Sequence, residues 1–109
     1  MISVVTAERD ADESLRRTIE SVRISRVPTT EYVVIDGASS PPTVSVLQHY
    51  SKQIDSWVSE PDRGISNAFN KGIAIANGEL IGMLNAGDWY EPEALRLVAE
   101  AYASHLDVD

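Results

Sequence analysis

The residues of this chain that could do chemistry gather in four short loops, each of which follows a short apolar run. The loops carry Thr6 and Glu8, then Asp36, then Asp62 and Arg63, and finally Asn85 and Asp88. Carboxylates and hydroxyls can exchange hydrogen bonds with the polar groups of a ligand, and a guanidinium beside a helix start can hold an anion. The pattern therefore predicts a polar binding site built from several loops.

The aspartates in these loops also have ordinary structural interpretations. Asp36 can simply turn the chain before Gly37, because Asp and Gly are common turn residues. Asp62 can cap the helix expected after it, and Asp88 can mark the start of a helix before Pro92. The residue types alone leave both interpretations open for all three aspartates.

Four short apolar runs predict the strands that position these loops. The runs are nearly continuous rather than alternating, which is typical of strands covered on both faces, as in a parallel sheet. They span residues 2–6, 32–35, 54–58 and 80–84.

Amphipathic segments between and after these runs predict four helices. Their expected starts are Asp12, the Ser39-Ser40 pair before two prolines, Ile65, and Glu91. Asn77-Gly78 is typical of a left-handed helix end. In the last helix we expect four residues to face inward: Leu95, Val98, Ala99 and Tyr102.

The order of these elements favours an α/β fold. Four β-α units in succession predict an open, mostly parallel sheet with helices on both faces. The length of 109 residues suits one domain, which we place at 1–109. In such sheets ligands bind at the carboxyl ends of the strands, which is where the four loops lie.

Composition narrows the class of protein. The chain is 43% apolar and 24% charged, as expected for a soluble domain. A net charge of −8 excludes the basic surface that duplex nucleic acid requires, so we expect no nucleic-acid partner. No apolar stretch approaches the length of a transmembrane segment. The absence of cysteine excludes thiol nucleophiles and fits a cytoplasmic location.

Two common phosphate-binding motifs are missing from the sequence. It contains neither G-x-G-x-x-G after the first strand nor G-x-x-x-x-G-K-[ST], which argues against a dehydrogenase or a P-loop nucleotidase. A phosphorelay receiver domain has the same size and fold class but carries its acids after the first and third strands. Here the most distinct acidic candidate, Asp36, follows the second strand.

Four segments in order resemble the N-terminal part of a family-2 glycosyltransferase, an inverting enzyme with the Rossmann-like GT-A fold. Residues 2–6 match its first strand, and residues 33–39 (V-V-I-D-G-A-S) resemble its V-D-D/G-G-S segment. The stretch 57–72 is the most specific match. Residues 77–90 lie where the family carries its D-x-D loop. The resemblance covers essentially the whole chain.

The resemblance implies a site for a nucleoside diphosphate sugar, with uridine as the favoured base. The implied binding residues are Thr6, Glu8, Asp36, Asp62, Arg63, Asn85 and Asp88. It also implies Mg²⁺ or Mn²⁺ held by Asp88, since diphosphate oxygens and waters can complete the coordination of such an ion. The chain departs from D-x-D, because Asn85 and Gly87 replace the two usual acids and only Asp88 keeps a carboxylate.

Members of this family are about twice as long as this chain. The resemblance therefore predicts that the acceptor site and the general base lie outside these residues, so no catalytic base is assigned. It implies a glycan or lipid-linked acceptor and a cytoplasmic protein, peripheral at most to the inner face of a membrane. The alternative is a truncated module that binds nucleotide without turnover or self-associates, as a homo-oligomer, through its open sheet edge.

Overall fold

The predicted strands form one sheet in the order β3-β2-β1-β4, and every neighbouring pair is parallel. The computed structural model describes residues 1–106, so the last three residues of the expected domain lie outside it. The strands are β1 (Ile2–Glu8), β2 (Thr30–Asp36), β3 (Ser56–Ser59) and β4 (Leu80–Met83). The helices are α1 (Asp12–Ser25), α2 (Pro41–His49), the 3₁₀ turn η1 (Ser51–Gln53), α3 (Ile65–Ile75) and α4 (Ala94–Leu106).

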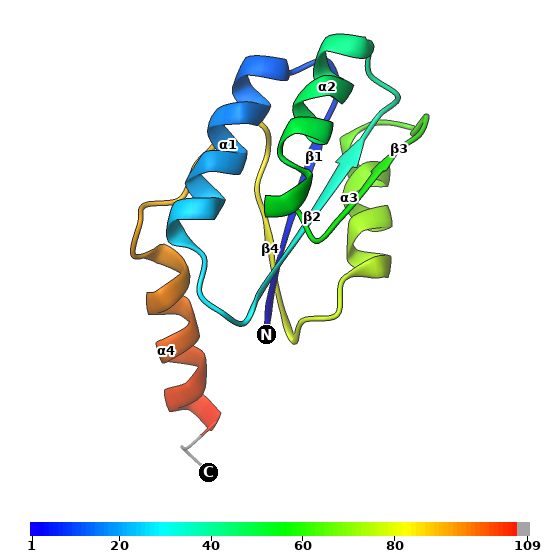
Figure 1. Ribbon diagram of the computed structural model, residues 1–109. Helices are drawn as coiled ribbons and strands as arrows, with labels where there is room; N and C mark the ends of the chain where they lie inside the picture. The colour runs from blue at the N-terminus through cyan, green and yellow to red at the C-terminus, as the bar shows by residue number, and fades with distance from the viewer. Residues whose placement is uncertain (107–109) are drawn as a thin grey trace.

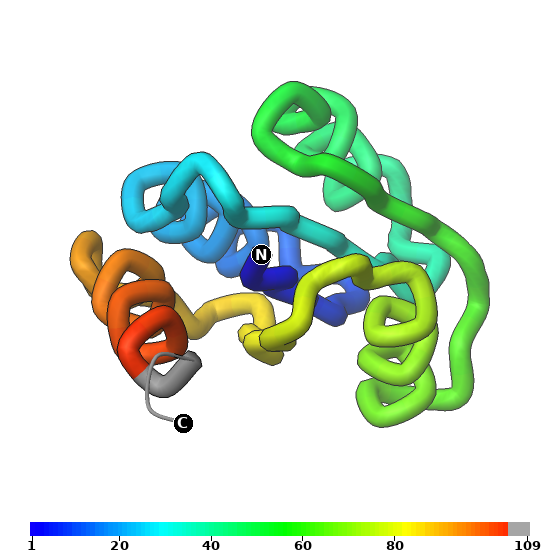
Figure 2. Tube along the Cα trace, turned by 90° about the horizontal axis from the view of Figure 1, so that it is seen from below, coloured from blue at the N-terminus to red at the C-terminus, as the bar shows by residue number. Residues whose placement is uncertain are grey.

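Helices cover both faces of this sheet, as the apolar runs predict. Alternate residues of a strand point to opposite faces, so β1 sends Val4 toward α1 and α2, and Val5 toward α3. Seen from below, α1 and α2 lie on one side of the strands and α3 lies on the other (Figure 2). Figure 1 shows α4 extending beyond the end of the sheet where the chain begins.

The register of the strands brings three of the four candidate loops to one edge. β1 ends at Glu8, which pairs with Asp36 at the end of β2, and Asp36 pairs in turn with Ser59 at the end of β3. On the other side of β1, strand β4 ends earlier, with Met83 opposite Val5. Because all four strands run the same way, their carboxyl ends define one end of the molecule, at the top of Figure 1.

Several boundary predictions are wrong by one to three residues. β2 and β3 span Thr30–Asp36 and Ser56–Ser59 instead of 32–35 and 54–58, and α4 begins at Ala94 instead of Glu91. β1 continues past Thr6 to Glu8, so that both residues belong to a buried strand rather than to the loop after it. Helix α1 is preceded by Ala11 in the capping position, and Asp12 is already its first residue. The predicted cap at Ser40 is correct, although no side-chain bond to the helix accompanies it there.

Two further predictions, for α3 and α4, are wrong because tertiary contacts override local signals. The residue after α3, Ala76, has extended backbone, and Gly78 is not left-handed. Gly78 is needed for space instead, since a Cβ there would lie 2.7 Å from the backbone nitrogen of Ser3. In α4 only Leu95 of the expected inward residues is fully buried, and Val98 is 45% exposed.

Candidate functional site

The carboxylate of Asp36 lies beneath the surface at the end of β2 and is well supplied with hydrogen bonds. It accepts bonds from the backbone N–H of Ser39 at 2.9 Å, from the hydroxyl of Ser39, and from the hydroxyl of Ser59 at 2.6 Å. Burial works to raise the pKa of Asp36, but hydrogen bonds from Glu8, Ser39 and Ser59 outweigh it and hold the pKa below its usual value. Asp36 is therefore ionised, and it joins the ends of β2 and β3.

The neighbouring carboxyl of Glu8 has the opposite character. Glu8 is only 5% exposed, and neither of its carboxyl oxygens accepts a hydrogen bond of ordinary geometry from the described part of the chain. Burial raises the pKa of Glu8 to about 9, and the hydrogen bond and charge of Asp36 add to the effect. At neutral pH the pair therefore holds one proton, which Glu8 carries beside the ionised Asp36.

A pocket of about 310 Å³ opens beside this pair, at the start of α3. It is lined by Glu8, Arg9, Asp62, Arg63, Gly64, Ile65 and Ala68. Gly64 occupies the capping position of α3 with φ +114°, a backbone conformation that favours glycine. The pocket thus combines two guanidinium groups with the positive end of a helix, which is a chemistry suited to anions such as phosphate.

The charged groups of the pocket differ in how far they are already engaged. Arg9 approaches Asp10 at 3.9 Å, whereas Arg63 forms no side-chain ion pair within residues 1–106. Asp62 accepts a bond from the backbone N–H of Gly64 at 2.9 Å. Arg63 is thus free to meet a ligand, and Asp62 holds the turn that precedes α3.

Gly37 allows this turn to approach the end of β2. A Cβ at Gly37 would lie 2.8 Å from the Asp62 carboxylate and 3.5 Å from the Cβ of Arg9. Any side chain there would push the Asp62 turn outward, since 2.8 Å is too short for a carbon–oxygen contact. Gly37 and Arg9 belong to the site but were missed as candidates; a cation immediately after the first strand was the available signal.

Thr6 is separated from this pocket. Its side chain is fully buried, and its hydroxyl lies 2.9 Å from the hydroxyl of Tyr32 in the core. Thr6 therefore supports the sheet from within in this structure, and a contact between Thr6 and a ligand stays a prediction.

The loop that carries Asn85 and Asp88 attaches to α1 and does not line the pocket. Thr18 of α1 accepts a bond from the backbone N–H of Gly87 at 2.9 Å and donates one to the carbonyl of Asp88 at 2.7 Å. Gly87 has φ +99°. The side chains of Asn85 and Asp88 are exposed. Within residues 1–106 no cluster of three His, Asp or Glu side chains could hold a metal ion by itself.

We expect Thr18→Val to loosen this loop, because valine keeps the shape of threonine but removes the hydroxyl that holds two backbone groups. The amide of Gly87 should exchange with solvent faster, and the unfolding free energy should fall by about 1 kcal/mol. Thr18→Ser keeps the hydroxyl and should restore both values. Hydrogen exchange followed by NMR measures the effect, and unchanged exchange of Gly87 in Thr18→Val would contradict the anchoring role.

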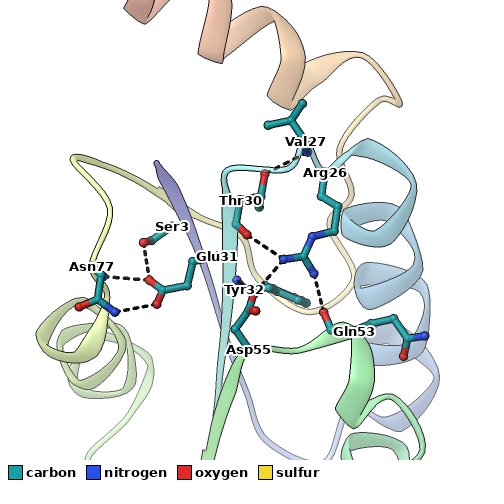
Figure 3. A network of polar contacts seen from close by, with 9 residues as sticks. All are labelled: Ser3, Arg26, Val27, Thr30, Glu31, Tyr32, Gln53, Asp55 and Asn77. Carbon is teal, nitrogen blue, oxygen red and sulfur yellow. Dashed lines mark hydrogen bonds and ion pairs between the residues drawn. The ribbon is translucent and has the colours of Figure 1, made fainter.

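Polar groups at the opposite end of the sheet form a separate network (Figure 3). There Glu31 accepts bonds from Ser3 and from two nitrogen atoms of Asn77, at 2.7 to 2.8 Å. Arg26 donates to Asp55 at 2.9 Å. Both carboxylates in this network accept hydrogen bonds from donors within the fold. A structural role therefore accounts for the network. The buried carboxyl of Glu8 lies at the other end, beside the pocket.

Comparisons with known proteins agree with this fold. The profile of glycosyl transferase family 2 matches residues 3–108. This chain belongs to glycosyl transferase family 2. An uncharacterized glycosyltransferase of Mycobacterium tuberculosis is 36% identical over 102 residues, which are 92% of this chain and 39% of that protein. The chain thus spans well under half the length of this relative.

Solved structures share the fold at low sequence identity. TarS of S. aureus, residues 1–349 in complex with UDP-GlcNAc, has a TM-score of 0.86 at 19% identity over 95% of this chain and 31% of that chain. A mannosyltransferase of Pyrobaculum calidifontis in complex with GDP-Man and Mn²⁺ has a TM-score of 0.76 at 20% identity over 84% of this chain and 29% of its own. These similarities confirm the GT-A type of α/β fold. No helix within the described residues is long and apolar enough to span a membrane.

Proposed function

We propose that residues 1–109 are the nucleotide-binding part of a glycosyltransferase that moves a sugar from a nucleoside diphosphate sugar to a glycan or lipid-linked acceptor. The observation that carries the proposal is the pocket at the carboxyl end of the sheet, where Arg9, Arg63 and the start of α3 converge. Two guanidiniums and a helix N-terminus can neutralise a diphosphate in a protein that is otherwise acidic. The general base is not assigned to any residue of this chain.

Uridine is the base that we propose for the donor. TarS, which shares the fold, was solved with UDP-GlcNAc, whereas the mannosyltransferase carries a guanosine nucleotide. Asp36 can accept a bond from the imide of uracil or from a ribose hydroxyl only by exchanging one of its bonds from Ser39 or Ser59. Binding of UDP in preference to GDP is the expected result, measured by calorimetric titration of each nucleotide.

Mg²⁺ or Mn²⁺ is the metal that we propose, held by Asp88 on the loop after β4, which lies outside the lining of the pocket. Its exposed carboxylate and the nearby amide of Asn85 offer hard oxygen ligands, and a diphosphate and waters can supply the rest. The ion would neutralise charge on the departing diphosphate. The chain's own part is to hold the Asp88 loop on α1 through Thr18.

We expect Asp88→Asn to weaken the binding of UDP in the presence of Mn²⁺ by about tenfold or more, because a charged ligand of the metal is lost. Without metal, UDP should bind the wild type weakly and the variant equally weakly. Calorimetric titration with and without Mn²⁺ measures both affinities. Glu91→Gln removes one negative charge near the same loop and serves as the control. Equal affinity of the wild type for UDP with and without metal would contradict the metal-binding role of Asp88.

A second candidate function is self-association, which the outer edge of β4 favours. In the part of the chain described, β4 pairs only with β1, and its Ile81 and Met83 are 40% and 61% exposed. An exposed apolar edge strand can pair with a second copy. We expect light scattering at micromolar concentration to return a dimer, and Met83→Lys to shift it toward the monomer. A clean monomer in the unaltered protein would exclude this function.

A further inference from the structure

Glu8 stands apart from the other acids of this molecule. Within residues 1–106, the buried side-chain oxygens without a hydrogen bond of ordinary geometry are the two carboxyl oxygens of Glu8. Burial of an ionised carboxylate without donors is costly, whereas a neutral carboxyl can donate a bond and needs less compensation. The acceptor is at hand, because Asp36 is the register partner of Glu8 on the adjacent strand.

The groups around Glu8 fix which of the two acids keeps the proton. Asp36 already receives bonds from Ser39 and Ser59, which stabilise its negative charge, whereas the backbone N–H of Ala11 does not offset the burial of Glu8. The charged and titratable groups that face Glu8 are Asp36 and Tyr32 from β2, Arg9 and Asp10 from the loop after β1, and Asp62 and Arg63 from the loop before α3. Arg9 and Arg63 are exposed to solvent, so the acidic groups contribute most to the electrostatic environment of the buried Glu8 carboxyl.

We propose that Glu8 is the residue that keeps the floor of the pocket uncharged: it holds a proton when the pocket binds an anion, and so leaves the lining with a net positive charge. Arg9 and Arg63 are then opposed by the single negative charge of Asp62. With Glu8 ionised, the lining charges would cancel. The inference rests on the proposed function for the identity of the anion, a nucleoside diphosphate. Glu8 lines the pocket, and its role in this inference is to set the charge of the lining rather than to hold the ligand by a bond.

The consequence is a dependence of nucleotide affinity on pH in the alkaline range. Once Glu8 loses its proton, an added negative charge under the diphosphate should weaken binding by about tenfold, the scale of one charge at pocket distance and protein dielectric. Glu8→Gln cannot ionise, yet its amide can still donate to Asp36. The variant should therefore bind like the wild type at pH 7 and more tightly than the wild type at pH 10.

The experiment has two readouts on the same proteins. Calorimetric titration of UDP from pH 6.5 to pH 10 compares the wild type with Glu8→Gln, so that titration of UDP itself is common to both. Glu100→Gln, which removes an exposed charge on α4, controls for net charge. Carbon-detected NMR on protein labelled at the glutamate carboxyls follows the titration of Glu8 without any ligand.

We expect the Glu8 carboxyl to titrate near pH 9 and the affinities of wild type and Glu8→Gln to diverge over the same range. Titration of Glu8 near its ordinary value would overturn the inference and leave the proposed function standing, as would parallel affinity profiles of the two proteins. No UDP binding at any pH in either protein would overturn the proposed function, and the inference with it.

Discussion

Glu8→Gln should remove most of the loss of stability that the wild type suffers as the pH rises from about 5 to about 9. In this window the folded protein keeps a proton on Glu8, because burial and Asp36 raise the pKa of Glu8 to about 9 from its ordinary value of 4.5. The unfolded chain has already lost that proton. Since the folded state binds more protons, the unfolding free energy falls with rising pH, by roughly 1 kcal/mol for each pH unit.

Urea denaturation at pH 5.5, 7.0 and 8.5 measures this slope. The glutamine variant has no proton to lose at this position, so its curve should be nearly flat and should lie above that of the wild type at pH 8.5. Asp36 contributes in the opposite sense and only in acid, because hydrogen bonds hold its pKa below the usual value and its stabilisation is lost when it is protonated. Parallel curves for the two proteins between pH 5.5 and 8.5 would show that Glu8 is ionised in the fold.

Gly72→Val should destabilise the protein by about 3 kcal/mol or more, a large part of the stability of a domain this size. Gly72 lies in α3 against the sheet, and a Cβ there would be 2.3 Å from a methyl of Val5 and 3.3 Å from Ile35. Both neighbours are fully buried on central strands and cannot move aside cheaply. The helix would have to lift from the sheet and move its N-terminus, which forms one side of the pocket.

Ala74→Val is the matched control for this substitution. Ala74 is exposed on the same helix, so the variant places a β-branched residue in α3 without any overlap, at a propensity cost of a few tenths of a kcal/mol. Thermal unfolding should show a midpoint lower by on the order of 10 °C or more for Gly72→Val and nearly unchanged for Ala74→Val. Equal midpoints would mean that α3 packs against the sheet differently from the structure described.

The sequence predicted the sheet well where strands are buried on both faces. The continuous apolar runs that contain Val4 and Val34 are the two central strands, and helices cover each face of them as expected. Predictions failed where a local signal competed with a distant contact. The pair Asn77-Gly78 is typical of a helix end, but the role of Gly78 is to make room for Ser3, which is far away in the sequence.

The candidate site was predictable in its location and less so in its roles. The sequence places Glu8, Asp36 and Asp62 near the ends of predicted parallel strands. Because such strands end at one edge of the sheet, this was enough to predict that the three acids lie close together. Sequence could not tell that Thr6 and Asp36 lie under the surface, since a polar residue near a strand end can face either a pocket or the core. The raised pKa of Glu8 depends on its burial and on the neighbouring charge of Asp36, which only the folded structure shows.

The central claim is that a nucleoside diphosphate binds where the strands end, at the start of α3. Amide NMR of the labelled protein titrated with UDP and Mg²⁺ tests this claim directly. The largest changes in amide chemical shift should fall on Arg9, Gly37 and the segment 63–65. The amide signals of Ser3, Glu31 and Asn77 at the opposite end should not change. Shifts confined to the opposite end or to the edge of β4, or no shifts at millimolar UDP, would contradict the claim.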